Sequence, residues 1–433
     1  MLKKLNNMFE IPELRQRIVF TILLLIVYRV GSHITTPGVN VALLAENFAR
    51  AGGGVLGLYD FFVGGNLSNA TIFALGIMPY ISASIILQLL QPVIPYLERV
   101  AKEGEEGRRK INQYTRYGTV LLSIVQSFGI SIFLEQLGVV TMAPLEFRLL
   151  TMMTMTSGTV FVMWLGEQIT ERGIGNGISL LIFIGIVARY PTDIMNTFRA
   201  VFVTQTLNIF LAVFLVVIMV AVTGLTVLIT QGQWRIPVQY ARRIIGRRML
   251  SGRTTHLPLR VNTAGVIPII FAQSIIMLPT SVAAFMRDNE FAQNLAYVLR
   301  PQGPTYIMLY SIIIIFFTYF YTAIVFNPMD VADSMRKNGG FIPGIRPGKR
   351  TAEFIDRVLS RITLPGGVFL AFIAVLPDLL IARGNVPFYF GGTGLLIVVG
   401  VALDTLQQIE SHLLMRHYDG FLKKGRLRGR SGF

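Results

Sequence analysis

Residues 71–100 read TIFALGIMPYISASIILQLLQPVIPYLERV, and residues 51–70 before them read AGGGVLGLYDFFVGGNLSNA. The later stretch is long enough to cross a bilayer, yet Pro79, Tyr80 and several serines and glutamines interrupt it. A helix that faces only lipid has little use for such groups, because each loses its hydrogen bonds to water on insertion. The pattern predicts a span that faces protein or water inside the membrane. A half-length apolar segment that does not cross precedes it.

The whole chain has the composition of a membrane protein. Of its 433 residues, 53% are hydrophobic and only 14% are charged, whereas soluble domains carry about 25% charged residues. Apolar surface is therefore expected to face lipid rather than to fill one large core. The chain has no cysteine, which excludes a disulfide framework and thiol chemistry.

Ten hydrophobic segments approach the roughly 20 residues that a spanning helix needs. We therefore expect an all-α polytopic membrane protein. The first segment is too long for the apolar region of a signal peptide, and nine more segments follow it. We therefore expect it to be a membrane span rather than a cleaved signal peptide. The expected spans are 18–34, 70–95, 117–135, 149–166, 177–190, 207–230, 261–285, 305–327, 358–380 and 391–412.

The positive charge is distributed unevenly. Most of the 39 Lys and Arg residues fall in one set of alternating loops, and this set includes both ends of the chain. The positive-inside rule then predicts that both termini are cytoplasmic. Topology and attraction to anionic lipids account for the net charge of +16 without a nucleic-acid-binding domain.

Two of the basic loops, about 231–260 and 327–357, are longer than a connection between spans requires. In the second, Pro343-Gly344 and Pro347-Gly348 bracket Ile345-Arg346, a pattern that predicts turns with Arg346 at a fixed tip. A basic, ordered tip suits docking to an acidic protein groove or to RNA phosphate. From the residues alone, a solvated charged loop is an equal alternative.

Catalytic patterns are weak. The four histidines have no metal-ligand spacing. GIRPGKRT at 344–351 resembles a phosphate-binding loop, but Arg350 stands where Ser or Thr would hold magnesium. The glycine-rich stretch 173–177 is better read as a tight turn. We expect no enzyme activity, no cofactor, no metal and no ATP site.

Charges inside the expected spans are few, and Arg29, Glu167, Asp378 and Asp404 lie near span ends. Ion-coupled transporters place such groups at mid-depth. A channel that moves its cargo without a charged relay therefore fits better than a secondary transporter, and a non-conducting scaffold is a third interpretation.

Several motifs, in order along the chain, resemble the SecY family, the large subunit of the Sec protein-translocation channel. TIFALGIMPYISASIILQLL at 71–90 looks like the signature of that family. The further matches are EGEEGRRKINQYTRYGT at 103–119, MWLGEQITERGIGNGIS at 163–179, THLPLRVNTAGVIPIIF at 255–271, FYTAIVFNP at 320–328, GFIPGIRPGKRTAEFIDRVL at 340–359 and VPFYFGGTGLLIVV at 386–399.

The resemblance implies ten transmembrane helices in two pseudo-symmetric five-helix halves around a central pore. The halves would be 1–190 and 191–433, joined by a hinge at 190–205. It also implies that residues of about 56–66 form a plug, a short helix in the closed channel, with Gly52–Gly54 and Gly64-Gly65 as hinges. A re-entrant loop is the simpler alternative. The plug residues would be Leu56, Leu58, Tyr59, Phe61, Phe62 and Asn66.

The resemblance further implies a hydrophobic pore ring, although isoleucines at helical spacing are also ordinary in membrane packing. The ring would comprise Ile77, Ile81, Ile182, Ile186, Ile267, Ile270 and Ile397. A lateral gate between the second and seventh spans would release transmembrane segments into lipid. Its candidate residues are Ser82, Gln88, Gln126, Gln273, Ser274 and Leu278, of which the glutamines could equally be ordinary interhelical contacts.

Because the chain has no recognisable ATP site, the driving energy must come from outside. The resemblance implies docking of the SecA motor ATPase or a ribosome on the two long cytoplasmic loops, with the candidate residues Arg247, Arg248, Arg253, Arg346 and Lys349. It also implies small membrane subunits of the SecE and SecG type. Secretory and membrane proteins would be the substrates. The expected location is the inner or plasma membrane of the cell.

Overall fold

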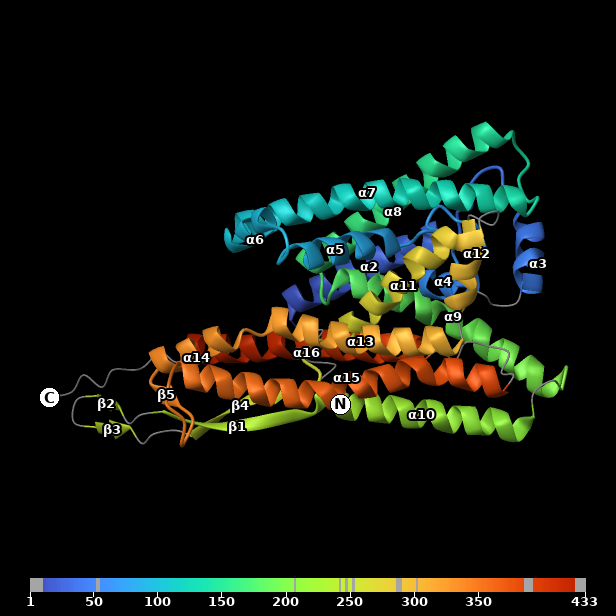
Figure 1. The fold of residues 1–433 in the computed structure, drawn as a ribbon. Helices are drawn as coiled ribbons and strands as arrows, with labels where there is room; N and C mark the ends of the chain where they lie inside the picture. Colours follow the sequence, from blue (N-terminus) through green and yellow to red (C-terminus); the bar gives the residue numbers. More distant parts are fainter. Residues whose placement is uncertain are drawn as a thin grey trace. The chain divides into compact units, whose positions relative to one another are not determined.

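A computed structural model of the chain describes residues 11–51, 55–205, 208–240, 243–245, 248–250, 254–285, 290–300, 303–384 and 392–424 (Figure 1). The chain forms two compact units, and each is described by itself. Unit 1 comprises Met1–Tyr190 and Val401–Phe433, and unit 2 comprises Pro191–Gly400. These units group residues by contact rather than by symmetry, so the halves 1–190 and 191–433 stay a prediction.

Helices make up the described part of unit 1. They are α2 (Pro12–Gly31), α3 (Val41–Ala51), α4 (Val55–Val63), α5 (Met78–Leu90), α6 (Pro95–Lys102), α7 (Glu105–Gln136) and α8 (Pro144–Arg172). Two further helices, α9 (Gly177–Phe202) and α16 (Gly392–Lys424), run from one unit into the other.

Unit 2 contains helices and short strands. Its helices are α10 (Ile209–Gln231), α11 (Ile267–Phe285), α12 (Glu290–Val298), α13 (Pro304–Val325), α14 (Pro328–Lys337) and α15 (Lys349–Gly384). Its strands are β1 (Gln233–Tyr240), β2 (Arg243–Ile245), β3 (Arg248–Leu250), β4 (Thr254–Arg260) and β5 (Gly340–Phe341).

Seven helices in the described ranges are long and apolar enough to cross a membrane, and α5 with α6 would make an eighth if that bent pair is one span. The remaining expected spans, 18–34 and 261–285, correspond to α2 and α11. The expectation of an all-helical polytopic membrane protein is confirmed. The strands lie in and beside the two long loops, where sequence patterning had not predicted them.

The span expected over 70–95 is wrong in its bounds. The chain runs through turns before Met78, and Gly76 has a left-handed φ of +54°. The helix α5 then begins with Pro79 in its first turn, where the missing N–H costs nothing. After Leu90 the chain bends by 100° into α6, next to Pro92 and Pro95, because proline ends a helix. Ile77 therefore precedes α5 instead of lying within it.

The helices α7 and α8 pack along each other. A row of small hydroxyl residues at four-residue spacing is buried on α7, and such residues let membrane helices approach closely. The row consists of Thr115, Thr119, Ser123, Ser127 and Ser131. Near one end Arg116 donates two hydrogen bonds to Glu167, at 2.9 and 2.8 Å. Near the other end Arg148 pairs with Glu135 at 2.7 Å.

The apolar core of unit 2 lies among α11, α13 and α15. Tyr310, Ile314 and Ile373 are buried there with Ile269 and Ile276. The helices α13 and α15 pack along each other over much of their length (Figure 1). On α13 the buried residues Tyr306, Tyr310 and Ile314 share one face. Other apolar residues of the helix, such as Ile312 and Phe316, are exposed, as expected for a span that packs against protein on one side and faces lipid on the other.

The two long loops form one structure. The strand β1 pairs antiparallel with β4 and also with β5, in the order β4-β1-β5. Because β1 and β4 come from the first loop and β5 from the second, the sheet ties the loops together. Buried side chains of the sheet, among them Ile236 and Leu259, pack with Met335 of α14 and Ile355 of α15.

Two connections clarify predictions made from the sequence. The glycine-rich stretch 173–177 is a turn: the Thr21 hydroxyl accepts a hydrogen bond from the Ile174 N–H, and the Gln408 side chain accepts one from the Gly175 N–H. The expected hinge at 190–205 is largely helical, because α9 continues through Pro191 to Phe202.

Candidate functional site

The segment expected to be a plug contains a short helix. The nine-residue α4 covers Leu56, Leu58, Tyr59, Phe61 and Phe62. Tyr59, Phe61 and Phe62 are buried, while the side chains of Leu56 and Leu58 lie outside the described residues, as does the expected hinge at Gly52–Gly54. Asn66 follows the helix in a turn and is also buried.

Polar contacts fasten this segment within unit 1. The Tyr59 hydroxyl donates to the Leu75 carbonyl at 3.2 Å, and the Asn66 amide donates to the Tyr28 hydroxyl of α2 at 3.3 Å. The carboxylate of Asp60 pairs with Arg189 of α9 at 3.1 Å. Sequence reasoning did not single out Asp60 or Arg189. The available signal was a lone carboxylate inside the apolar run VLGLYDFFV.

The end of α4 makes two close approaches through glycine. At Gly64, which has φ +77°, an added Cβ would lie 2.7 Å from the Gly185 Cα of α9. At Gly76 an added Cβ would lie 2.9 Å from Cγ1 of Val63. Neither site tolerates a side chain without movement, so glycine allows α4 to lie directly against both neighbouring segments.

Four of the predicted ring residues belong to unit 1, and all four are buried. Ile77 is the residue before α5 and Ile81 lies in its first turn. Ile182 and Ile186 lie on α9 one turn apart. Ile77 is next to Gly76, and Ile186 is next to Gly185. The close approaches of α4 therefore occur directly beside two of the predicted ring positions.

The other three ring residues belong to unit 2. Ile267 and Ile270 lie in the first turn of α11, and Ile397 lies in the second turn of α16. Ile270 and Ile397 are buried. The third turn of α16 lies close to the residue that precedes α11, since a Cβ added at Gly400 would collide with Cγ1 of Val266.

The predicted gate residues have different hydrogen-bonding states. On α5 the Gln88 amide donates to Ser84 of the same helix at 3.0 Å, and Ser82 is buried. On α11 the Ser274 hydroxyl donates to the Ile270 carbonyl at 2.8 Å. Among the described residues, the Oε1 atom of Gln126 on α7 and the Nε2 atom of Gln273 are buried without a hydrogen-bond partner. The side chain of Leu278 lies outside the described residues.

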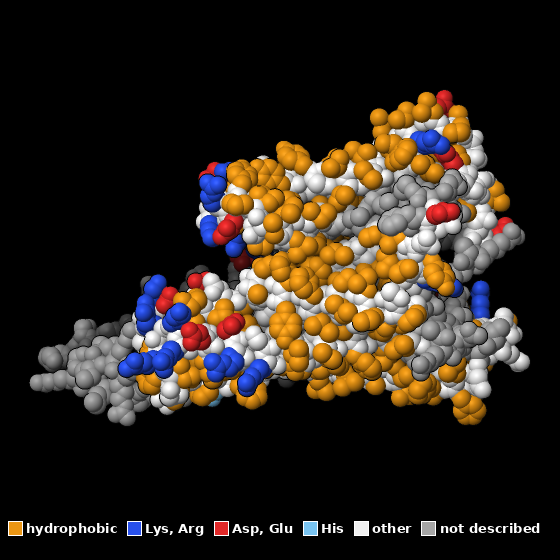
Figure 2. Space-filling model, viewed as in Figure 1, with side chains coloured by type: hydrophobic (Ala, Val, Ile, Leu, Met, Phe, Trp, Pro, Cys, Tyr) orange, Lys and Arg blue, Asp and Glu red, His pale blue; other side chains and the backbone are white. Residues whose placement is uncertain are grey.

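The predicted docking residues fall in the two joined loops. Arg346 and Lys349 are exposed. Backbone turns fix the tip, with Gly344 and Gly348 at φ +82° and +105°, and the Thr351 hydroxyl donates to the Arg346 carbonyl at 2.9 Å. Figure 2 shows Lys and Arg side chains gathered over the end of unit 2 that carries α14 and the strands. Arg247 and Arg253 lie outside the described residues, as does the side chain of Arg248 in β3.

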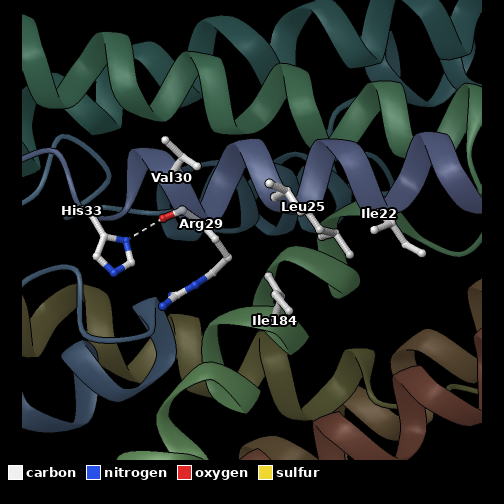
Figure 3. A pocket seen from close by; sticks show the side chains of 7 residues that line it. Ile22, Leu25, Arg29, Val30, His33 and Ile184 are labelled. Carbon is white, nitrogen blue, oxygen red and sulfur yellow. Dashed lines mark hydrogen bonds between the residues drawn. The ribbon is translucent and has the colours of Figure 1, made fainter.

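A pocket of about 410 Å³ lies between α2 and α9, and five of its seven lining residues are aliphatic. Figure 3 shows Arg29 extending from α2 into this pocket, with the Nδ1–H of His33 donating to the Arg29 carbonyl at 2.8 Å. A long basic side chain near a helix end can reach the interface in this way. Within the described ranges, no group of three or more His, Cys, Asp or Glu side chains could hold a metal ion.

Comparison with known proteins gives close relatives. The SecY family profile matches residues 71–406. The protein translocase subunit SecY of Thermotoga maritima is 47% identical over 435 residues, which cover 98% of this chain and 99% of that protein. SecY of Escherichia coli K12 is 48% identical over 425 residues, which cover 96% of each chain.

Solved structures share the fold at low identity. A protein-conducting channel superposes with a TM-score of 0.64 at 18% identity, over 92% of each chain. A SecY structure whose plug domain stabilises the closed state of the translocation channel and maintains a membrane seal also gives 0.64, at 17% identity and with 92% of each chain covered. Sec61 in the canine ribosome-channel complex from the endoplasmic reticulum gives 0.61, at 18% identity and again over 92% of each chain.

These matches decide among the three functions considered from the sequence. The family profile covers most of the chain, and the relatives match it almost from end to end. The alternatives of a small-solute transporter and a non-conducting scaffold are therefore set aside. The chain belongs to the SecY family: it is a multi-pass membrane protein and a protein-conducting channel subunit, not an enzyme.

Proposed function

We propose that unfolded secretory polypeptides cross the membrane through a constriction lined by the isoleucine ring. Apolar side chains at a narrow point exclude water and so block ions. They also contact a passing chain through dispersion forces, which do not depend on its sequence. The ring consists of Ile77, Ile81, Ile182, Ile186, Ile267, Ile270 and Ile397.

One observation carries this proposal. The end of α4 lies directly against Gly76 and Gly185, the neighbours of the ring positions Ile77 and Ile186. A short helix beside such a constriction would act as its stopper. Glycine at Gly64 and Gly76 permits this seat, since both have a left-handed φ.

A lateral gate would let hydrophobic segments leave for lipid. The gate is proposed between α5 and α11, with Ser82, Gln88, Ser274 and Leu278 facing the seam and with Gln126 and Gln273 as further polar groups. Hydrogen bonds within membranes are weak, about 0.6 kcal/mol on average. The buried, unpartnered Gln273 amide is a group that could bond across such a seam, and a partitioning substrate helix could break so weak a bond.

The driving force would act on the joined loops of unit 2. We assign docking of a SecA-type motor ATPase or a ribosome to these loops through Arg247, Arg248, Arg253, Arg346 and Lys349. Arg346 is the strongest candidate, because it is exposed on a tip held by turns. The canine Sec61 relative is found in a ribosome-channel complex, which supports the ribosome as a partner.

The remaining assignments follow from family membership and charge. Both termini would be cytoplasmic in the inner or plasma membrane, since the basic loops include both ends of the chain. SecE-type and SecG-type small membrane subunits would complete the complex. Anionic lipids would surround its basic side.

An export assay with purified complex in vesicles tests the constriction and the docking site together. Replacing Ile182 by Asn should admit substrates with defective signal sequences, because a polar side chain weakens the apolar seal. Replacing Arg346 by Glu should abolish motor-driven export of normal substrates while leaving the protein folded. Unchanged selectivity in Ile182→Asn would contradict the ring assignment, and normal export by Arg346→Glu would contradict the docking assignment.

A further inference from the structure

We propose that Asp60 and Arg189 form a latch that holds α4 in its seat and sets how readily the channel opens. The inference rests on the proposed role of α4 as a stopper. In this view the two residues are positioning residues, which act on the constriction through α4. They would determine how strong a signal sequence must be to gain entry.

The latch joins two elements of unit 1 that are far apart in the sequence. The Nη1 atom of Arg189, on α9, donates to Oδ2 of Asp60, on α4, at 3.1 Å. The guanidinium carbon also lies 5.7 Å from the centroid of the Phe61 ring, a cation–π distance. One arginine thus contacts both the charged and the aromatic side chain at the middle of α4.

Asp60 also fastens the turn that follows α4. Its Oδ1 atom accepts hydrogen bonds from the backbone N–H groups of Leu67 and Ser68, both at 2.9 Å. The two oxygens of one carboxylate therefore have separate tasks: Oδ1 shapes the plug segment itself, and Oδ2 attaches that segment to α9. Substitutions can separate these tasks.

The burial of the pair makes it a strong but breakable attachment. The Asp60 side chain is 5% exposed and the Arg189 side chain 30%. A buried carboxylate is costly unless it is paired, so the pair holds while α4 stays in place. The other approach of α4 to α9, at Gly64 and Gly185, brings two residues without side chains together. Withdrawal of α4 would bring Asp60 and Arg189 into water, where each charge is solvated.

Such an attachment would tune an equilibrium between seated and displaced α4. A substrate can shift that equilibrium only by the free energy with which it favours the displaced state. Weakening the latch lowers the free energy that any substrate must supply to displace α4. Channels without the ion pair should therefore leak small ions and accept weak signal sequences.

The test measures ion leak through the complete channel complex reconstituted in vesicles, without substrate. Asp60→Asn keeps an Oδ1 acceptor for the two backbone N–H groups and removes the charge that pairs with Arg189. We expect the leak to rise about tenfold, a change equivalent to about 1.4 kcal/mol in the equilibrium. Glu135→Gln is the matched control, since it breaks the ion pair with Arg148 between α7 and α8. It should leave the leak unchanged.

A double-variant cycle separates the latch from a general loss of stability. If the two residues act through one contact, Asp60→Asn combined with Arg189→Gln should leak no more than the leakier of the two single variants. Additive effects would overturn the latch, and so would an Asp60→Asn channel as tight as the unmodified one.

Deletion of residues 56–63 distinguishes failure of the latch from failure of the proposed stopper. If the deletion leaks and Asp60→Asn does not, the latch is wrong and the stopper role stands. If neither variant leaks, α4 does not seal the channel and both assignments fall.

Discussion

The α7–α8 pair and the short helix α4 are both held within unit 1, but by different means. Along α7 a row of buried small residues packs over several turns, with the Arg116–Glu167 and Arg148–Glu135 ion pairs near its two ends. The nine-residue α4 buries Tyr59, Phe61 and Phe62, and beyond these it is held by a few polar side-chain bonds and two approaches at glycine. A long interface of close packing is lost only on unfolding, whereas a short helix fastened at a few points can be released while its surroundings stay folded.

The largest expected effect comes from disturbing the permanent interface. Ser127 is fully buried on α7, so Ser127→Leu must force α7 away from its neighbours. Overpacking of this kind costs about 3 kcal/mol. We expect a clear loss of thermal stability in detergent, without a specific gain in ion leak. Size-exclusion chromatography with fluorescence detection, after heating, would measure that loss.

Val125 offers the matched control for that change. It lies on the same helix but is 55% exposed, where it would face lipid. Val125→Leu should therefore leave thermal stability within error. Equal losses for both variants would show that α7 is sensitive throughout and would remove the contrast with α4.

A smaller effect on stability, but a larger one on sealing, is expected at Gly64. A left-handed conformation costs a residue with a side chain about 1 kcal/mol, and the new Cβ would meet the Gly185 backbone. We expect Gly64→Ala to fold, to lose little thermal stability and to leak ions. Gly65 also has a positive φ, but an added Cβ there meets nothing within 4 Å. If the Gly64→Ala channel does not leak, or if Gly65→Ala leaks equally, the close approach at Gly64 is not what seals the channel.

The smallest effect is expected from Arg116→Gln. Arg116 is 46% exposed, and exposed ion pairs contribute only about 0.5 kcal/mol. The close packing along α7 should keep this helix in place without the pair. Chemical denaturation of the purified protein would measure this. A loss as large as that of Ser127→Leu would mean that the ion pairs near the ends, rather than the buried row, hold α7 in place.

Sequence patterns identified a membrane protein because the length of an apolar run can be read from neighbouring residues alone. The family motifs led us to expect a short helix at about 56–66, and α4 is found at Val55–Val63; its role as a plug stays a prediction. Patterning failed where distant residues decide the outcome. The helix expected from residue 70 begins only at Met78, because residues 71–77 are held in turns by contacts such as the Ile72 N–H bond to the Ile34 carbonyl at 2.9 Å. The strand β5, only two residues long, exists because β1 lies beside it.

The sequence by itself determined that this chain is a polytopic membrane protein, that its basic residues gather in alternating loops, and that its motifs are those of the SecY family. Each of these is written in composition or in short contiguous runs. Only the tertiary structure paired Asp60 with Arg189, 129 residues apart, joined the two basic loops in one sheet, and set Gly64 against Gly185. Tertiary packing determines which of these distant residues meet, and their spacing along the chain does not predict it.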